Sequence, residues 1–208
     1  MVEHLLEDGE RHVTNSMDIT SLLESFSKYV SLGKDATTAL QSKVIHRIVK
    51  KRQFILQRGD VCKHYSFVVE GCFRMYYADM NGKEHNLKFA IEGEWIADIG
   101  SFHSLKPSEF DIEAIETSSI LRISRDDLIE LYVQHPQFDR HFRVEIENEF
   151  IELQKRVLQS IGSTAMERYV DFVECHPRLL NRISNVQIAS YLGMTPEFLS
   201  KIRKGMLG

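Results

Sequence analysis

The spacing of hydrophobic residues changes along the chain. Between residues 17 and 49, apolar positions recur every three or four residues, which predicts helices interrupted near Gly33. From residue 52 to residue 124 the pattern becomes short segments rich in β-branched and aromatic residues, separated by glycine-containing turns such as Asn81-Gly82. Short strands at this regular spacing predict an antiparallel barrel or roll.

The helical period returns at Ser124, whose side chain can cap a helix that carries Asp126 and Asp127 in its first turn. Pro136 separates this short helix from a long one that extends to about Ser160. Along the long helix runs a narrow apolar stripe, formed by Phe142, Ile146, Phe150, Leu153 and Val157. Such a stripe predicts a seam between two copies of the chain, and the alternative is that it covers the β-roll.

Residues 183–204 have the pattern of two short helices joined by a tight turn. Ser184 can cap the first helix and Thr195 the second, while Gly193 supplies the turn. We expect the apolar side chains to pack inward, namely Val186, Ile188, Ala189, Leu192, Phe198, Leu199 and Ile202. This pattern is typical of a DNA-reading helix-turn-helix, and the alternative is a helical hairpin that only completes a core.

Polar and basic residues lie on the outer side of the second helix. The candidate DNA contacts are Thr195, Glu197, Ser200, Lys201, Arg203 and Lys204. Hydroxyl and carboxylate groups can reach base edges, whereas the basic side chains suit phosphates. The whole chain has a net charge of -4, so binding to double-stranded DNA has to come from this local cluster.

Composition argues against several other classes of protein. The 208 residues include three cysteines and no Cys-x-x-Cys pair, which disfavours a disulfide framework or a cysteine-built metal site. The N-terminal residues lack the apolar run of a signal peptide, and no segment is long enough to span a bilayer. We therefore expect a cytoplasmic protein without a membrane partner.

A β-roll, a long helix and a terminal helix pair, in this order, resemble the cyclic-AMP receptor and fumarate-nitrate regulator (Crp/Fnr) family of bacterial transcription factors. The resemblance extends from about Ser21 onward. Its motifs are Arg58-Gly59-Asp60, Val68-Val69-Glu70-Gly71, Gly93-Glu94, Gln187-Ile188-Ala189 and Leu192-Gly193. The end of the chain is similar to a divergent branch of the family that is common in Bacteroidetes-like bacteria.

The resemblance implies an α+β fold in four parts. These are a flexible extension (1–16), leading helices with an antiparallel β-roll of the cyclic-nucleotide-binding jelly-roll type (17–124), a long dimerisation helix (125–160) and a C-terminal helix-turn-helix domain without a full hairpin wing (161–208). The family's base-reading arginine is replaced by Pro196, whereas Glu197 keeps the implied contact to cytosine amino groups. The operator should therefore differ from that of the better-known relatives.

The resemblance also implies an effector pocket formed by Asp98, Ile99, Gly100, Ser108 and Glu109. Asp98 takes the place of the family's ribose-binding glutamate. Ser108 and Glu109 stand where the family has its phosphate-binding arginine and the following serine. A carboxylate without that cation repels a cyclic phosphate. The implied effector is therefore a small molecule other than cyclic AMP, and a vestigial pocket is the alternative.

These features predict a homodimeric transcription regulator that is not an enzyme. Its expected partners are double-stranded DNA, a second copy of itself, an unknown small-molecule effector and, as a further candidate, RNA polymerase. We expect no metal and no cofactor, because the N-terminus lacks iron-sulfur cysteines and His64, His85 and His103 are isolated. A cupin enzyme is disfavoured by the lack of a His-x-His motif. A module with the same fold that binds a small molecule or a protein instead of DNA stays open.

Overall fold

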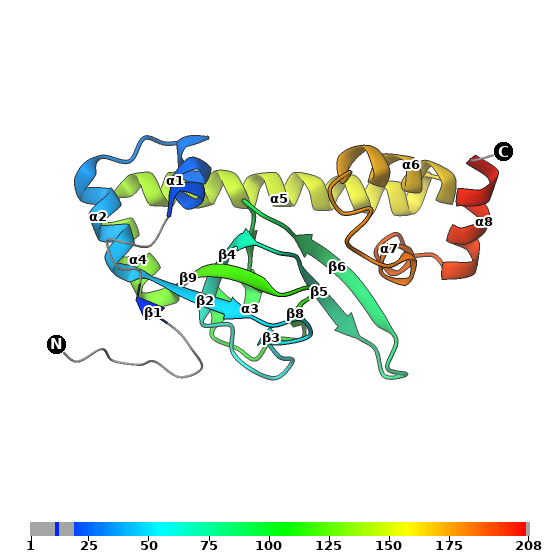
Figure 1. The fold of residues 1–208 in the computed structure, drawn as a ribbon, viewed down its shortest axis with the longest axis horizontal. Coiled ribbons are helices and arrows are strands. Elements are labelled where there is room, and N and C mark those ends of the chain that lie inside the picture. Colours follow the sequence, from blue (N-terminus) through cyan, green and yellow to red (C-terminus); the bar gives the residue numbers. More distant parts are fainter. Residues whose placement is uncertain (1–10, 13–18, 207–208) are drawn as a thin grey trace. The chain divides into compact units, whose positions relative to one another are not determined.

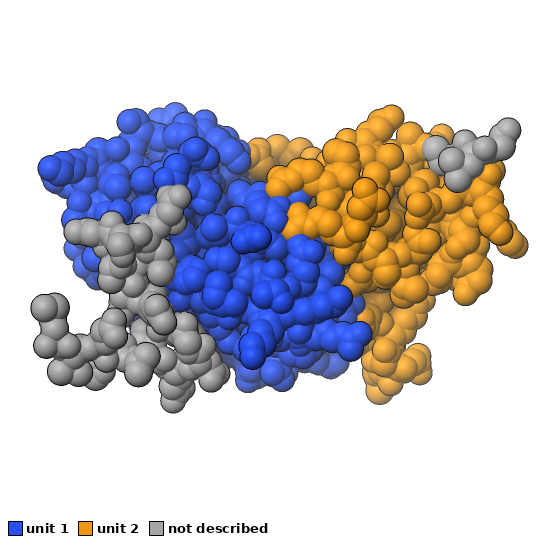
Figure 2. Space-filling view, in the orientation of Figure 1, with its two compact units in different colours: residues 1–75, 89–145 blue, residues 76–88, 146–208 orange. Residues whose placement is uncertain are grey.

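The computed structural model describes residues 11–12 and 19–206, and Figure 1 shows the order of its helices and strands. The chain forms two compact units, coloured separately in Figure 2. Unit 1 comprises residues 1–75 and 89–145. Unit 2 comprises residues 76–88 and 146–208. The segment 76–88 therefore groups with the C-terminal helices, although it lies far from them along the chain.

The strands form two sheets, with the orders β1-β2-β9-β4-β7 and β3-β8-β5-β6. Their bounds are β1 Arg11–His12, β2 Val44–Val49, β3 Phe54–Leu56, β4 His64–Glu70, β5 Phe73–Ala78, β6 Glu84–Ala90, β7 Trp95–Ile96, β8 Asp111–Ala114 and β9 Ser118–Ser124. β9 pairs antiparallel with both β2 and β4. The turn between β5 and β6 contains Gly82 at a φ of +76°, a conformation that favours glycine. The expected antiparallel roll with its hairpin is therefore present.

We predicted a helix at the end of the segment 17–49, and this prediction is wrong for Val44–Val49, which form strand β2. Val44 pairs with Ile123 and Val49 pairs with Ser118, so the segment belongs to the sheet. Apolar spacing in so short a segment fits a helix as well as a strand. The hydrogen bonds offered by β9 decide between them, and this is an effect of tertiary structure.

In the described part of unit 1, the strands are accompanied by helices α1 to α4 and by the first part of the long helix α5. Their bounds are α1 Thr20–Ser27, α2 Lys34–Lys43, α3 Ile99–Ser104, α4 Arg125–Gln134 and α5 Pro136–Gly162. Ser124 caps α4, because its hydroxyl accepts a hydrogen bond from the Asp127 backbone N–H at 3.1 Å. Pro136 begins α5, which confirms the predicted break.

Aromatic side chains fill the core of unit 1. The ring of Trp95 lies edge-on to Tyr65 and Phe67 of β4, and Phe142 from α5 approaches it with ring centroids 4.9 Å apart. Phe142 is only 2% exposed. Its predicted place in a seam between two chains is therefore wrong, because the first turns of α5 cover the β-roll and bury this ring.

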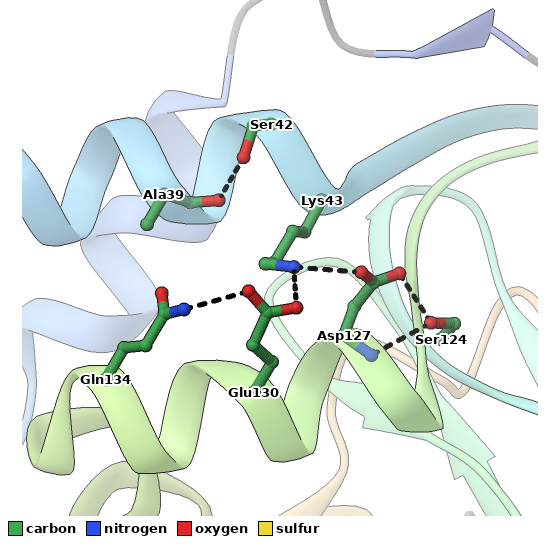
Figure 3. Close-up of polar contacts among 7 residues, drawn as sticks. All are labelled: Ala39, Ser42, Lys43, Ser124, Asp127, Glu130 and Gln134. Atoms are coloured by element: carbon green, nitrogen blue, oxygen red, sulfur yellow. Dashed lines mark hydrogen bonds and ion pairs between the residues drawn. The ribbon is translucent and has the colours of Figure 1, made fainter.

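Lys43 at the end of α2 ties that helix to α4, as Figure 3 shows. Its Nζ lies 3.0 Å from Asp127 Oδ1 and 2.7 Å from Glu130 Oε2, and Gln134 donates to the Glu130 carboxylate. The hydrogen bond from Lys43 lowers the pKa of Glu130, and the Glu130 carboxylate in turn raises the pKa of Lys43. Ser124 also donates to Asp127, so the helix cap joins the same network.

Unit 2 combines the second part of α5 with three shorter helices and the segment 76–88. The helix bounds are α6 Ala165–Cys175, α7 Asn185–Tyr191 and α8 Pro196–Met206. Thr164 begins α6 with a capping box, in which the Thr164 hydroxyl and the Glu167 carboxylate each accept a backbone N–H of the other residue.

The predicted flexible extension lies mostly outside the described residues. Within it, Arg11–His12 pair with β2. The predicted division at residues 124 and 160 stays a prediction.

Candidate functional site

Local capping builds the helix pair α7 and α8. The Ser184 hydroxyl accepts from the Gln187 backbone N–H at 3.3 Å, and the Gln187 side-chain oxygen accepts from the Ser184 N–H at 2.9 Å. Gly193 forms the turn at a φ of +66°. The Thr195 hydroxyl accepts from the Phe198 N–H at 3.2 Å, so the two predicted caps and the turn are confirmed.

The contact between α7 and α8 uses fewer apolar residues than we predicted. Ile188, Ala189, Leu199 and Ile202 are buried. Val186 and Phe198 are 61% and 48% exposed, so their predicted inward orientation is wrong. Each residue turns a helix by about 100°, which places Val186 on the far side of α7 from Ile188 and Phe198 beside the inward stripe of α8. Two apolar side chains are thereby left on the surface of the helix pair.

Charged side chains lie exposed along α8. Glu197, Lys201, Arg203 and Lys204 all face solvent. The backbone N–H of Glu197 and the Thr195 hydroxyl hold the pKa of the Glu197 carboxyl below its ordinary value, so it is ionised at neutral pH. The helix therefore offers one carboxylate and three cations to a partner.

Two of the predicted contact residues of α8, Ser200 and Arg203, already have partners within unit 2. The Ser200 hydroxyl donates to the Pro196 carbonyl at 2.9 Å. Arg203 donates from Nη1 to Asn185 Oδ1 at the start of α7. Arg203 therefore also holds α8 against α7. Among the described residues, the other two cations of α8, Lys201 and Lys204, make no such contact with α7.

Strand β6 of the β5–β6 hairpin is bound to α7. The Asn86 backbone N–H donates to Ser190 Oγ at 2.9 Å, and the Ser190 hydroxyl donates to the Glu84 carbonyl at 2.7 Å. The Asn86 side chain donates to the Gln187 carbonyl at 3.1 Å. Asn86 is buried, and these bonds satisfy its backbone N–H and its side-chain amide nitrogen.

Arg156 of α5 joins the same parts of unit 2. Its guanidinium donates to the Leu87 carbonyl at 2.5 Å and to the Tyr191 carbonyl at 3.3 Å, and it lies 3.9 Å from the centre of the Tyr191 ring. Such planar, multiple contacts are specific to arginine. The hairpin, α5 and the end of α7 are thus held by one side chain.

The predicted effector pocket is closed by its own hydrogen bonds. Asp98 caps α3 by accepting from the Ser101 N–H at 3.1 Å, and its other oxygen accepts from the Ser108 hydroxyl at 2.7 Å. Both Asp98 and Ser108 are buried. Their side chains are thus hydrogen-bonded to each other.

The remaining predicted pocket residues, Ile99, Gly100 and Glu109, are not among those that line the cavity of about 520 Å³ in unit 1. Ile99 packs against the core of unit 1, and Gly100 and Glu109 are exposed. That cavity has different walls, and the role of the predicted pocket residues stays a prediction. Ser101, whose hydroxyl donates to the Lys106 carbonyl at 2.6 Å, holds the intervening loop in place.

A cavity of about 520 Å³ lies within unit 1. We call it the β-roll cavity, and it is lined by Arg47, Ile55, Leu56, Gly59, Asp60, Val61, Cys62, Lys63, His64, Ser66, Ile96, Ile112, Ile120 and Arg122. The sequence contained one signal for it. Ile120 and Arg122 are two residues apart along β9, so their side chains lie on the same face of the sheet. This places a cation beside an apolar side chain of the interior.

The pKa of His64 reflects the positive charges around the β-roll cavity. Burial lowers its pKa first, and the positive charges of Arg122, Arg47 and Lys63 lower it further, while Asp127 acts in the opposite direction. The resulting pKa is about 4. The imidazole is therefore neutral at neutral pH and can both donate and accept a hydrogen bond.

The second part of α5 carries an exposed apolar surface. Phe150, Leu153 and Val157 of the predicted seam are exposed, and Ile146 is half-buried. Three residues that we did not predict extend this surface, namely Ile151, Leu158 and Ile161. We call these six exposed residues the α5 stripe.

Within residues 11–12 and 19–206, no group of three or more histidine, cysteine or acidic side chains is placed to hold a metal ion. In the same part of the chain, no helix has both the length and the hydropathy needed to cross a membrane.

The fold and its cavity define a class of protein. Residues 46–135 match the sequence family described as the cyclic nucleotide-binding domain, so the β-roll is a domain of this kind. The predicted fold class is thereby confirmed.

The chain is also similar to proteins that are named as transcriptional regulators. The chain is 26% identical to the transcriptional activator protein Anr of Pseudomonas protegens over 75% of this chain and 68% of that protein. It is 23% identical to the probable transcriptional regulator flp of Lacticaseibacillus casei, over 85% and 82% of the two chains. The structure of FixK2 from Bradyrhizobium japonicum superposes with a TM-score of 0.69 at 22% identity, over 78% of this chain and 84% of that one. The chain is thus a homologue of the Crp/Fnr-type transcriptional regulators, as predicted. Its place in a Bacteroidetes-like branch stays a prediction.

Proposed function

We propose that the protein is a dimeric, sequence-specific DNA-binding regulator of transcription. The observation that carries this proposal is α8, which is capped by Thr195, anchored on α7 by Leu199 and Ile202, and exposed along its charged side. The named relatives are transcriptional regulators and not enzymes, which supports the prediction that this chain has no catalytic activity.

In this function α8 enters the major groove of double-stranded DNA. Lys201, Arg203 and Lys204 contact phosphates, while Thr195, Glu197 and Ser200 lie towards the base edges. The ionised Glu197 carboxylate is suited to accept from a cytosine amino group. Because Arg203 also binds Asn185, its loss should disturb the helix pair as well as the phosphate contact.

Binding to a twofold symmetric DNA site needs two copies of α8, and a dimer supplies them. The α5 stripe supports one, because exposed apolar residues along a helix are stabilised by burial against a second copy. Phe150, Leu153 and Val157 are the predicted seam residues that contribute to it. A twofold dimer would bring two reading helices to successive half-sites.

The β-roll supplies the sensor in this proposal. The exposed Glu109 and the mutual pairing of Asp98 with Ser108 leave no cation or free donor for a cyclic phosphate at the predicted position. In this proposal the effector is a small molecule other than cyclic AMP. The cytoplasm, where DNA and RNA polymerase are available, is the proposed place of action.

One observation favours a second candidate function. Val186 and Phe198 are exposed apolar residues on α7 and α8, and such residues suit a protein partner better than they suit phosphates. In this alternative the helix pair docks another protein and does not bind DNA.

Selection of genomic DNA fragments at low and moderate salt tests the proposal. We expect enrichment of a twofold symmetric site, with an affinity that falls as salt rises because phosphate contacts release counterions. Lys201→Gln should reduce the salt slope by about one, whereas Lys51→Gln, at an exposed turn of unit 1, should leave it unchanged. Absence of enrichment, together with binding to a protein that requires Phe198, would establish the alternative.

A further inference from the structure

We propose that Phe198 reads a thymine of the DNA operator, through contact between its ring and the 5-methyl group of that base. Because the contact lies on the same helix as the other base contacts, it rests on the proposed function. It adds a residue that determines specificity by apolar contact, without a hydrogen bond to the base. One position of each half-site should therefore favour thymine over the other three bases.

The ring of Phe198 belongs to the first turn of α8. The helix begins at Pro196, and the Phe198 backbone N–H donates to the Thr195 hydroxyl at 3.2 Å, so the cap holds this turn in place. Side chains of a helix lean towards its N-terminus. In helix-turn-helix proteins, this end of the reading helix contacts the base edges. In the proposed complex, the ring is therefore at the end of α8 that approaches the bases.

The packing of α8 leaves the ring of Phe198 partly in solvent. Leu199 and Ile202 are 0% and 7% exposed, and they define the side of α8 that is buried. Phe198 is 48% exposed, because a helical step of about 100° places it beside that buried side. A rotation of α8 that buried the ring would expose Leu199. The exposed part of the ring is therefore a fixed feature of the helix surface.

Charged side chains lie on the solvent side of the ring. Glu197 precedes Phe198, and Lys201 lies about 60° from it around the helix, with both charges facing solvent. The cores of protein–protein interfaces are depleted of charged residues. In a DNA groove, by contrast, methyl groups occur between hydrogen-bonding base edges and phosphates. An aromatic ring next to a carboxylate and an ammonium group therefore fits DNA better than a protein partner.

Thymine is the base with a matching apolar group in the major groove. Adenine, guanine and cytosine present mainly hydrogen-bond donors and acceptors there, which a phenyl ring cannot satisfy, whereas thymine presents its 5-methyl group. Phenylalanine is one of the side chains that contact this methyl group. The contact removes apolar surface of both partners from water, and this stabilises the complex. The ring thus distinguishes thymine from the other bases.

The neighbouring Glu197 indicates where this thymine lies. In the proposed complex, the Glu197 carboxylate accepts from a cytosine amino group. Adjacent residues of a helix are about 1.5 Å apart along its axis, and stacked bases are about 3.4 Å apart. We therefore expect the thymine within about two base pairs of the cytosine–guanine pair that Glu197 reads, in each half-site.

Uracil scanning of the operator obtained by genomic selection tests the proposal on the full chain. Each thymine of a half-site is replaced in turn by uracil, which lacks only the 5-methyl group, and binding of the duplex is measured by fluorescence anisotropy. At one position, uracil should weaken binding by about fourfold in one half-site and by about fifteenfold in both, as expected for the loss of one buried methyl group per half-site.

Variants show whether Phe198 senses the methyl group. Phe198→Ala should bind the thymine and uracil duplexes of that position with affinities within about twofold of each other, because the two changes remove the same contact. Phe198→Gln, with a polar side chain, should behave in the same way and provides a second test if the alanine variant is unstable. The salt slope should stay as in the wild-type protein, because phosphate contacts are unchanged.

The matched control is Val186→Ala. Val186 is also an exposed apolar residue of the helix pair, but it lies on α7. Its substitution should leave the fourfold effect of uracil in place. Near-ultraviolet circular dichroism checks the fold of each variant.

Three results would overturn the proposal. These are a selected half-site without a thymine, a uracil scan without a sensitive position, and a uracil effect that persists in both Phe198 variants. Failure of this proposal is distinguishable from failure of the proposed function. A selected site that is insensitive to uracil contradicts the thymine contact alone, whereas the absence of any selected site contradicts DNA binding and the contact with it.

Discussion

At the scale of single residues, His141 is a titratable group placed in an apolar core. It is fully buried on α5, and its ring lies 4.1 Å from the ring of Phe26 between centroids. Neither ring nitrogen has a hydrogen-bond partner among the described residues, and a Glu145 oxygen lies 4.0 Å away. Burial, and to a smaller extent the charge of Lys28, lowers the pKa of His141 to about 4.

This environment makes the stability of the protein depend on pH. The unfolded chain binds a proton at His141 near pH 6.5, whereas the folded chain does so only near pH 4. The stabilising contribution is therefore complete above about pH 6.5 and is lost as the pH falls towards 4, by at most about 1.4 kcal/mol per pH unit. His141→Leu should reduce this slope in urea unfolding curves measured between pH 7 and pH 4. His64 should keep its own share of the slope.

A matched control is available at the exposed His103. His103→Leu should leave the slope as it is in the wild-type protein. An unchanged slope in His141→Leu would show that the buried ring is not the source of the acid sensitivity.

At the scale of elements, the β5–β6 hairpin is attached to α7 mainly through Ser190. This hydroxyl both accepts from the Asn86 N–H and donates to the Glu84 carbonyl. Since Asn86 is buried, its N–H would have no obvious replacement partner if the hydroxyl were removed. Sequence patterns give no indication of this attachment, because its two sides are far apart in the chain.

Ser190→Ala should therefore lower the free energy of unfolding by about 1 to 2 kcal/mol. It should also speed hydrogen exchange at the Asn86 amide more than at other amides of unit 2. Ser42→Ala is the control, because the Ser42 hydroxyl is exposed and donates only to the Ala39 carbonyl of its own helix. Equal effects of the two substitutions would contradict a specific role for the attachment.

At the scale of the whole molecule, the α5 stripe makes assembly of two chains the expected state. Val157 is 49% exposed, so a charge at this position is compatible with the folded monomer but not with a buried seam. Val157→Glu should convert a wild-type dimer to a monomer at micromolar concentration in analytical ultracentrifugation, and it should weaken binding to a twofold symmetric DNA site. Val133→Glu, at a position of α4 that is 79% exposed, should leave the dimer intact. A monomeric wild-type protein would contradict the dimer proposal.

The outcome for the apolar stripe of α5 shows where sequence reasoning stops. Phe142 and Phe150 fit the same helical spacing and look equivalent in the sequence. One is buried against Trp95, and the other is exposed. Spacing defines which side of a helix is apolar, but the element that covers each turn depends on the rest of the fold.

The sequence by itself determined the features that depend on neighbouring residues. The caps at Ser124, Thr195 and Ser184, the glycine turn at Gly193 and the break at Pro136 follow from local hydrogen bonds and backbone freedom, so they were predicted correctly. The class of fold followed from the order of these elements together with the family resemblance.

Only the tertiary structure decided the features that depend on distant residues. Strand β2 exists because β9 pairs with it, and the Asp98 carboxylate is bound within unit 1 because Ser108 donates to it. The cations of the β-roll cavity likewise meet only when the strands that carry Arg47 and Arg122 become neighbours in a sheet. Local spacing specifies short-range hydrogen bonds, whereas burial and charge balance arise from contacts that the order of residues does not display.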